Sequence, residues 1–355
     1  MHQKYLDFFL GANSPEGFYS LYESARKEKE YDTFLIKGGP GTGKSSFMKK
    51  VLENQNDAII ERVHCSSDPD SLDGIILHDK NIIMLDATPP HALEPQYPGA
   101  VESSVNINEC WDEKALKTRR AQIVATSDEN AKLHARARRF LKVFYTLCLD
   151  NTALMSEGID YQKLALFCTR FCDKIIPKQK GKGKKYERIL SAVTPKGVVF
   201  YQNTVDALCE QVFVIKDEFS LCAEDILKKV EKTALERGFD VYSCYCPISS
   251  GKKLEHLIIP SLKLGIVTQN RYHAYSGDNQ RVISYTRFAD AGKLKEKKSK
   301  VSWNKRCAAE LLTQAVRTLS LAKQNHDKLE ALYTPSVDFN KVNLLCEKVT
   351  VRING

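Results

Sequence analysis

An apolar run that leads into a glycine-rich loop and then into Lys-Ser-Ser constrains this chain more than any other feature. The apolar run ends at Lys37, and a helix-like segment begins at Phe47. Between them, four residues fit the pattern G-x-x-x-x-G-K-[ST] of a phosphate-binding P-loop: Gly38, Gly43, Lys44 and Ser45. A strand before the motif and a helix after it are the context that the motif requires. The sequence therefore predicts a site for a nucleoside triphosphate.

Each residue type in this loop has a physical reason. Glycines let successive backbone amides turn toward an anion, because no Cβ blocks the close approach. The start of the following helix adds unpaired amides and the positive end of its dipole. Lys44 is expected to reach the β- and γ-phosphates, and the Ser45 hydroxyl is expected to bind Mg²⁺. The predicted nucleotide contacts are Gly38, Gly39, Pro40, Gly41, Thr42, Gly43, Lys44, Ser45 and Ser46.

A second motif consists of four apolar residues followed by an aspartate, Ile82-Ile83-Met84-Leu85-Asp86. A carboxylate at the end of a buried strand beside a P-loop is where such enzymes hold Mg²⁺. Asp86 is therefore predicted to bind Mg²⁺ together with Ser45, and to be catalytic together with Lys44. The next residue is Ala87 and not glutamate, so a group that activates water must come from elsewhere.

The segment His64–Gly74 is the expected source of that group. It follows a predicted strand, and in a parallel sheet it emerges at the same edge as the P-loop. Asp68, Asp70 and Asp73 are candidate bases or water-positioning groups. The alternative is a simple turn with helix-capping residues. His91, just past the next strand, is a candidate for sensing phosphate or for a structural part.

The chain repeats itself at an offset of about 180 residues. Gly11–Gly17 resembles Ser191–Gly197, and Phe34–Lys37 returns as Phe213–Lys216. Further matches keep this order and offset: Cys65 with Cys246, His91 with His273, and Asp160–Leu164 with Asp338–Val342. We therefore predict two tandem P-loop NTPase domains of α/β class, with mostly parallel sheets flanked by helices and a helical extension on each. The expected domains are residues 1–178 and 187–355, joined by a lysine-rich segment.

The local patterns predict individual elements in the first half. Strands are expected at 33–37, 58–63 and 81–85, with a short one at 104–107, and a helix is expected at 45–52. After Trp111 apolar residues recur at helical spacing, from Leu133 to Leu147, with a counterpart at Leu311, Ala315 and Leu319. This apolar stripe is expected to pack against the sheet or against its twin.

The second half has lost the P-loop chemistry. Its matching slot is Asp217–Asp225, where Ala223 replaces the lysine and Glu224 replaces the serine. Acidic side chains there would repel phosphate. The second half is therefore predicted to be a pseudo-domain. Such a domain can still donate an arginine across an interface, and the candidates are Arg271, the first choice, with Arg281 and Arg287.

Composition narrows the class of protein. The 355 residues carry a net charge of +9, and lysines cluster at 178–185 and 293–300. These clusters could engage nucleic acid or a protein partner, although a solvated linker is the simpler interpretation. The eleven cysteines show no zinc spacing. No apolar run reaches the length of a membrane span and no secretory signal begins the chain, so we expect a cytoplasmic protein without a membrane partner.

With these motifs in hand, the chain resembles the tandem P-loop ATPases of Firmicutes bacteria over nearly its whole length. The resemblance rests on the P-loop, on His64–Gly74, and on Leu85–His91 with its Pro-His ending. Members of that family often carry a better-preserved second P-loop, from which this sequence departs. The resemblance implies binding and hydrolysis of ATP and gives no substrate or pathway.

Three functions follow from these patterns. The first is a Mg²⁺-dependent ATPase with one active site in the first half. The second is a small-molecule or nucleoside kinase, in which Asp68 would activate an acceptor hydroxyl. The third is a nucleotide-gated protein that binds nucleic acid through the lysine clusters. No motif indicates which base is preferred.

Overall fold

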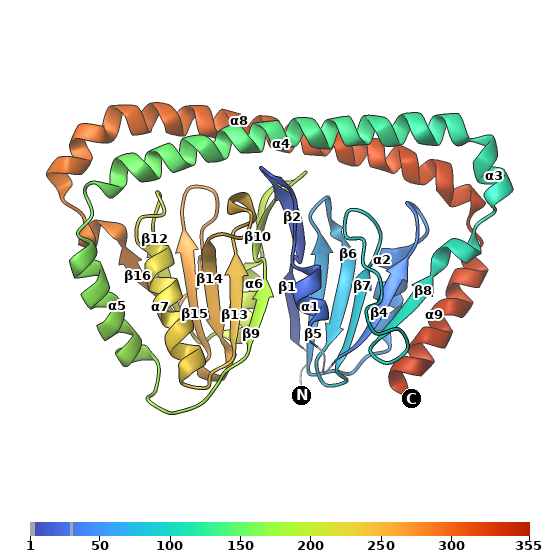
Figure 1. Ribbon diagram of the computed structural model, residues 1–355, viewed down its shortest axis with the longest axis horizontal. Coiled ribbons are helices and arrows are strands. Elements are labelled where there is room, and N and C mark those ends of the chain that lie inside the picture. The colour runs from blue at the N-terminus through green and yellow to red at the C-terminus, as the bar shows by residue number, and fades with distance from the viewer. Residues whose placement is uncertain (1–3, 29–30) are drawn as a thin grey trace.

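The computed structural model describes residues 4–28 and 31–355, and Figure 1 shows two β-sheets side by side beneath a layer of long helices. The first sheet has six strands in the order β1 (Lys4–Phe8), β5 (Ile59–Cys65), β6 (Asp68–Leu77), β7 (Ile82–Asp86), β4 (Asp32–Lys37) and β8 (Glu102–Asn106). Only β6 runs antiparallel to its neighbours in this sheet.

The second sheet repeats this order strand for strand. It consists of β9 (Lys185–Arg188), β13 (Val241–Tyr245), β14 (Leu254–Ile259), β15 (Leu264–Gln269), β12 (Gln211–Lys216) and β16 (Gln280–Ser284). Its antiparallel strand, β14, stands where β6 stands in the first sheet. The predicted α/β class, with mostly parallel sheets in two similar halves, is confirmed.

The four strands predicted in the first half all form, within two residues of the expected ends. The prediction for His64–Gly74 was wrong, because this segment is not one loop: β5 continues to Cys65, and β6 begins at Asp68. The polar sequence from Asp68 to Asp73 hid this strand, since aspartate, proline and glycine are rare in strands. Strand β1 was also missed.

The smaller elements follow the same repeat. Each half has a hairpin and a short helix near its start: β2 (Gly11–Ser14), β3 (Gly17–Ser20) and α1 (Tyr22–Arg26), then β10 (Ser191–Thr194), β11 (Gly197–Phe200) and α6 (Gln202–Leu208). The helices after the P-loop slots are α2 (Lys44–Glu53) and α7 (Ala223–Glu236). Short 3₁₀ helices are η1 (Ile107–Cys110), η2 (Pro247–Ser249), η3 (Pro260–Leu262), η4 (Tyr285–Phe288) and η5 (Thr334–Ser336).

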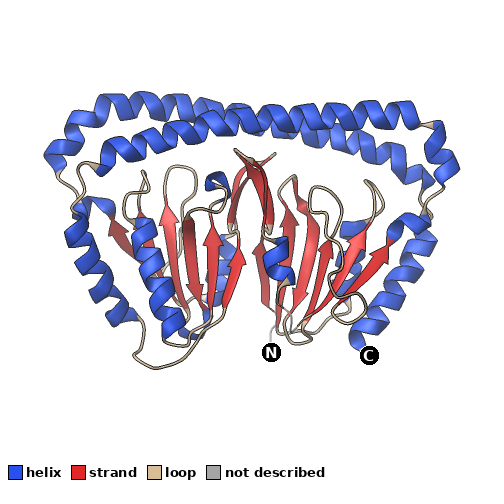
Figure 2. Cartoon of the chain, in the orientation of Figure 1, coloured by secondary structure: helices blue, strands red, loops and turns tan. Residues whose placement is uncertain are grey.

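Two long helices span both sheets (Figure 2). After α3 (Glu113–Thr118), helix α4 (Arg120–Ser156) crosses toward the second sheet, and α8 (Ala291–Tyr333) returns toward the first. The predicted apolar stripe lies between them, with Ala137 and Leu141 of α4 in one buried cluster with Ala315 and Leu319 of α8. The stripe therefore packs against its twin.

The last helix of each half packs on the other half's sheet. Helix α5 (Tyr161–Ile175) places Leu164 and Phe171 in the core of the second half, against α7. Helix α9 (Phe339–Asn354) places Val342 and Cys346 in the core of the first half. Residues 1–178 and 187–355 are thus repeats of sequence, whereas each compact body combines one half with the other half's last helix.

A buried ion pair joins the halves between β9 and β5. Arg188 is fully buried, and its Nε donates to Glu61 Oε2 at 2.6 Å. Its Nη1 also reaches Glu28 Oε1 at 3.2 Å. Burial alone would raise the pKa of Glu61, but Arg188 and His78 outweigh it and hold the pKa at about 2. The carboxylate is therefore ionised and paired inside the interface.

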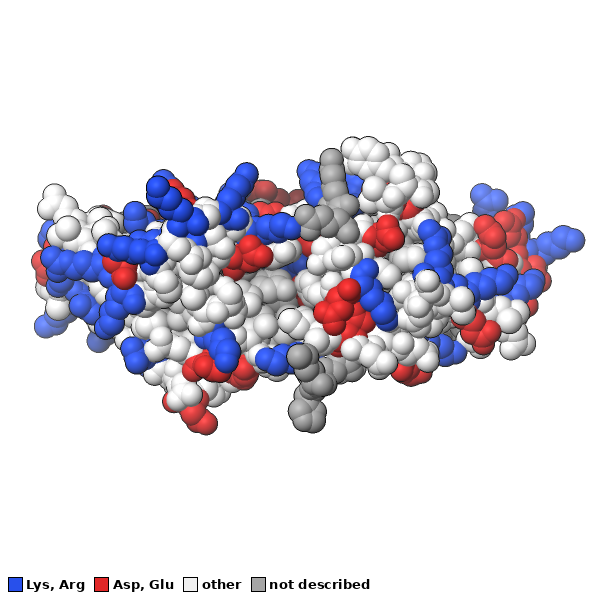
Figure 3. Space-filling view, turned by 90° about the horizontal axis from the view of Figure 1, so that it is seen from below, with Lys and Arg blue, Asp and Glu red and all other residues white. Residues whose placement is uncertain are grey.

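The lysine clusters lie apart from both sheets' cores. Residues 178–184 form most of the irregular connection from α5 to β9, and residues 293–300 form the exposed start of α8. On the face opposite the long helices, Figure 3 shows basic side chains mixed with acidic ones. All eleven cysteines are free, and six of them are buried, as expected of small apolar side chains. Within residues 4–28 and 31–355, no helix combines the length and apolar character needed to cross a membrane.

Candidate functional site

The predicted P-loop connects β4 to α2 at the upper edge of the first sheet. Its backbone has the form that the glycines suggested: φ is +68° at Gly41 and +84° at Gly43. These left-handed angles are costly for residues with a Cβ. Gly43 is the residue directly before the first helical residue, Lys44, so the loop turns straight into the start of α2.

The amides at the start of α2 have no acceptor within the chain as described. Gly39 donates its N–H to Asn108 Oδ1 at 2.9 Å, and the Thr42 hydroxyl donates to Gly39 O at 2.8 Å. Among residues 4–28 and 31–355, none accepts the N–H groups of Gly43 or Lys44. Unpaired amides at a helix start are suited to binding an anion.

Lys44 and Asp86 meet at the ends of adjacent strands. Strand β4 pairs directly with β7, and Ile36 is opposite Asp86. Lys44 Nζ lies 3.6 Å from Asp86 Oδ2 and also donates to Gly38 O at 2.6 Å. Burial raises the pKa of Asp86, and the nearby Lys44 ammonium opposes that rise. The two side chains therefore lie next to each other, and their shared role at a nucleotide site stays a prediction.

Ser45 is fixed between helix and sheet. Its Oγ accepts the N–H of Leu72, in the middle of β6, at 2.9 Å. The hydroxyl proton and the remaining lone pair of Ser45 stay available, so this contact is compatible with the predicted role as a Mg²⁺ ligand.

Asp73 is the acidic residue of β6 that lies beside Asp86. Because Gly74 pairs with Leu85 in an antiparallel ladder, the preceding Asp73 and the following Asp86 are neighbours across the strands. The Asp73 carboxylate contacts Tyr22 Oη at 3.4 Å and His91 Nε2 at 3.4 Å. It is nearly buried, and its charge adds to the rise in the pKa of Asp86.

His91 lies in an aromatic enclosure. Its ring stacks on Tyr22 with centroids 4.6 Å apart and meets Phe18 edge-on at 4.8 Å. Its Nδ1 is buried without a hydrogen-bond partner in the described chain. The stacked rings of His91 and Tyr22 therefore both contact the same Asp73 oxygen, Oδ2.

The other two aspartates of this segment are paired with lysines from the second half. Asp68 Oδ2 lies 3.3 Å from Lys323 Nζ of α8. Asp70 Oδ2 lies 2.5 Å from Lys196 Nζ, and both of these side chains are more than half exposed. These contacts tie β6 to the second half. A catalytic role for Asp68 and Asp70 stays a prediction.

The exchanged segment between α8 and α9 covers the P-loop. A Cβ added at Gly41 would lie 2.7 Å from Thr334 Oγ1 and 2.8 Å from Glu330 O. Phe339 lies beside Gly43 at 3.4 Å by the same measure. Sequence reasoning could not find these neighbours, because their position depends on the crossing of α8 to the other half.

The slot in the second half is filled by its own side chain. Asp217 follows β12 as Gly38 follows β4. Its Oδ2 accepts the N–H groups of Leu221, Cys222 and Ala223 at 2.7 to 2.9 Å. A carboxylate thus takes the place that a phosphate would take at the start of α7. That the second half does not bind phosphate stays a prediction, and this contact agrees with it.

The three candidate arginines all lie within the second half. Arg271 Nε is 3.7 Å from Glu218 Oε1, and Arg281 and Arg287 lie over the rings of Phe213 and Phe167. Their proposed reach across the interface stays a prediction. Comparisons with family models, curated proteins and solved structures find no match to this chain.

Proposed function

We propose that the chain is a Mg²⁺-dependent ATPase with one nucleotide site, formed by the P-loop of the first half. The observation that carries the proposal is the meeting of Lys44 and Asp86, 3.6 Å apart, beside the unpaired amides at the start of α2. This combination of a cation, a carboxylate and an amide cradle suits a triphosphate with its metal ion.

The residues of the proposed site fit both the triphosphate and Mg²⁺. The amides of Thr42 to Lys44 and the Lys44 ammonium would hold the phosphates, and Ser45 with Asp86 would hold Mg²⁺, directly or through water. The metal ion supplies charge neutralisation at the phosphates when it is bound. Adenine as the base rests on the family resemblance alone.

Asp73 is the residue we assign to orienting the attacking water. It is the carboxylate next to Asp86, and Tyr22 and His91 fix its position. A group that only positions water needs a fixed geometry more than a high pKa. Asp68 and Asp70 instead form ion pairs with lysines of the second half.

Phosphate release from ATP and Mg²⁺, without any acceptor, tests this proposal. We expect release by the native chain, a loss of at least about 100-fold in Lys44→Ala, and no change in Lys228→Ala. Lys228 is the matched control, because it is an exposed lysine of α7 that pairs with Glu224 on the same helix. Release that requires an added nucleoside or metabolite would instead identify a kinase. Equal phosphate release by the native chain and by Lys44→Ala would contradict both the ATPase and the kinase function.

A further inference from the structure

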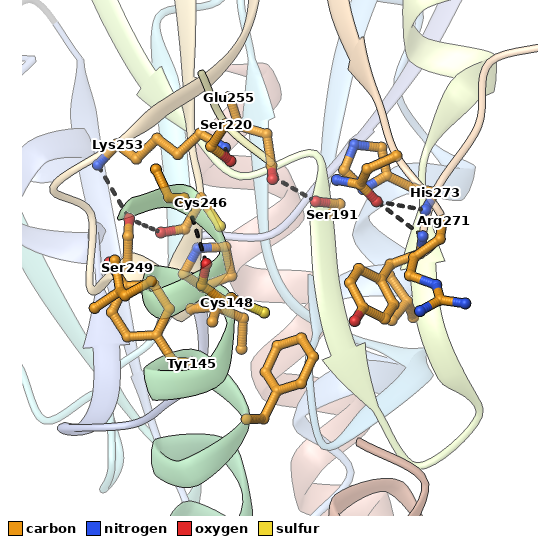
Figure 4. Close-up of a pocket in the computed structure, with 18 of the residues that line it drawn as sticks. Tyr145, Cys148, Ser191, Ser220, Cys246, Ser249, Lys253, Glu255, Arg271 and His273 are labelled. Atoms are coloured by element: carbon orange, nitrogen blue, oxygen red, sulfur yellow. Dashed lines mark hydrogen bonds between the residues drawn. The ribbon is translucent and has the colours of Figure 1, made fainter. Parts of the chain in front are cut away.

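The second half contains a cavity at the place where the first half has its nucleotide site. The cavity has a volume of about 430 Å³ and lies between α4, the hairpin β10–β11 and the upper ends of β14 and β15 (Figure 4). A volume of this order suits a small organic ligand. Its walls are largely apolar, and include Phe144, Val193 and Leu312.

The helix start beside the cavity has no free amides to bind a phosphate. Asp217 already accepts the three amides at the start of α7. The lysine and aspartate of the first half are also gone, since Ala223 replaces Lys44 and Thr268, paired with Ile215, replaces Asp86. A nucleotide has no anchor here, so the ligand belongs to another chemical class.

Most charges around the cavity are already matched. Glu218 pairs with Lys305 at 3.0 Å and with Arg271 at 3.7 Å. Glu224 pairs with Lys228 at 2.6 Å, and Lys252 pairs with Glu16 at 3.1 Å. These pairs lie mostly toward the rim, where solvent weakens them.

Two opposite charges on the inner wall, Lys253 and Glu255, form no salt bridge of this kind among the described residues. Burial would raise the pKa of Glu255, and Lys253 is close enough to oppose that rise. Lys253 forms no ion pair with any described residue, and its ammonium donates to Ser220 Oγ at 2.5 Å. Glu255 is buried, and it accepts the Ser191 hydroxyl at 2.7 Å (Figure 4). The two side chains are two residues apart at the start of β14, so they leave the strand on the same side.

The histidines behind Glu255 do not make this a metal site. Glu255, His256 and His273 lie close enough together to hold an ion. However, the Thr268 N–H donates to His256 Nδ1 at 3.2 Å, so the ring proton is on Nε2. That N–H faces Glu255 Oε2 at 3.7 Å and presents no lone pair to a metal. Burial lowers the pKa of both histidines, which keeps them neutral.

We propose that this cavity binds a small zwitterion with an apolar body, such as a hydrophobic amino acid or a dipeptide of such residues. Glu255 receives the ligand's ammonium group and Lys253 receives its carboxylate. The apolar walls take up the side chain. The site does not depend on nucleotide binding in the first half.

Titration calorimetry with the full chain tests the site. The probes are leucine, phenylalanine and leucyl-leucine, each compared with its N-acetylated and its amidated form. We expect one molecule of the free zwitterion per chain, with an affinity at least about thirtyfold above that of either blocked form. Binding should persist in Lys44→Ala, so the outcome is independent of the nucleotide proposal.

Two variants test which ligand group each charged residue binds. In Lys253→Met, amidation of the ligand should no longer weaken binding, whereas acetylation still should. In Glu255→Gln the pattern should reverse. Lys252→Met, at the exposed neighbour, should bind as the native chain does. If Glu255→Gln does not fold, the Lys253→Met pattern alone decides. Absence of binding by every probe, equal affinity for blocked and free forms, or tight binding of Zn²⁺ alone would overturn the proposal.

Discussion

Asp217 stands in the second half where Gly38 stands in the first. Each is the first residue after its strand, and each opens the loop that leads to a helix start. In the second half, the Asp217 carboxylate accepts the amides of residues 221–223. In the first half no side chain exists at this position. The helix start of the second half therefore holds a carboxylate of its own, whereas the first half has no side chain at the matching position.

Replacing Asp73 tests its role in orienting water. We expect Asp73→Asn to lower the rate of phosphate release about 100-fold, because the amide has one acceptor oxygen where the carboxylate has two with which to orient the water. Nucleotide affinity should stay within about twofold, since Asp73 is not part of the amide cradle. Asp70→Asn is the matched control, because Asp70 lies on the same strand but pairs with exposed Lys196. A larger loss in Asp70→Asn would contradict the assignment.

Because the two halves exchange their last helices, we can predict how the chain behaves when its halves are expressed as separate fragments. Residues 1–178 expressed alone lack α9, so Phe47, Met48 and Val51 of α2 would face water instead of Val342 and Cys346. We expect this fragment to give no folded monomer. Coexpression with residues 179–355 should yield a one-to-one complex that melts cooperatively. A stable, monomeric 1–178 fragment, seen by light scattering and calorimetry, would show that the exchange is not needed.

The buried ion pair between the halves predicts a large loss of stability. Arg188→Met leaves Glu61 and Glu28 without their cation inside the interface. Removal of one partner of a buried pair costs about 3–5 kcal/mol. Lys232→Ala, which removes an exposed ion pair with Glu236, should cost less than about 1 kcal/mol. Denaturant unfolding of both variants measures the difference, and similar values would contradict the account.

The buried histidine behind the second cavity predicts a dependence of stability on pH. Burial lowers the pKa of His256 from 6.5 to about 3 in the folded chain. The unfolded chain therefore takes up a proton below pH 6.5, and the folded chain does so only near pH 3. Stability is fully present above pH 6.5 and falls as the pH decreases below it, by up to about 1.4 kcal/mol per pH unit. Unfolding at pH 7 and pH 5.5 should show a smaller loss in His256→Gln than in the native chain, and equal losses would argue against burial of a neutral ring.

Much of the fold could be predicted from local patterns. The strand before the P-loop, the strand ending at Asp86 and the long helices all carry strong apolar periodicity. The internal repeat identified two similar halves, because an ordered series of matches reflects one ancestral unit. Strand β6 was missed because its first residues, Asp68 to Asp70, are typical of a turn.

The site was predictable only where it is local in sequence. Lys44 and Asp86 lie close together because the strands that precede them, β4 and β7, are parallel neighbours that end at one edge of the sheet. Their role at a nucleotide site stays a prediction. The choice among the three aspartates was not predictable, because it depends on the antiparallel register of Gly74 with Leu85. The cover over the P-loop, from Glu330 to Phe339, arises from the exchange between halves, which no local pattern encodes.

In this account the two halves differ at the backbone amides that start α2 and α7. Placing the second half's residues in the first loop tests this difference most directly. In the double variant Gly38→Asp, Thr42→Leu, the first loop carries the Asp–Leu pair that the second half has at Asp217 and Leu221. The threonine must change too, because a Cβ at Gly38 would lie 2.6 Å from its Oγ1. Calorimetric titration with Mg²⁺ and a non-hydrolysable ATP analogue should give one site per native chain and none in the folded double variant. Two sites per native chain, or undiminished binding by the variant, would contradict the account.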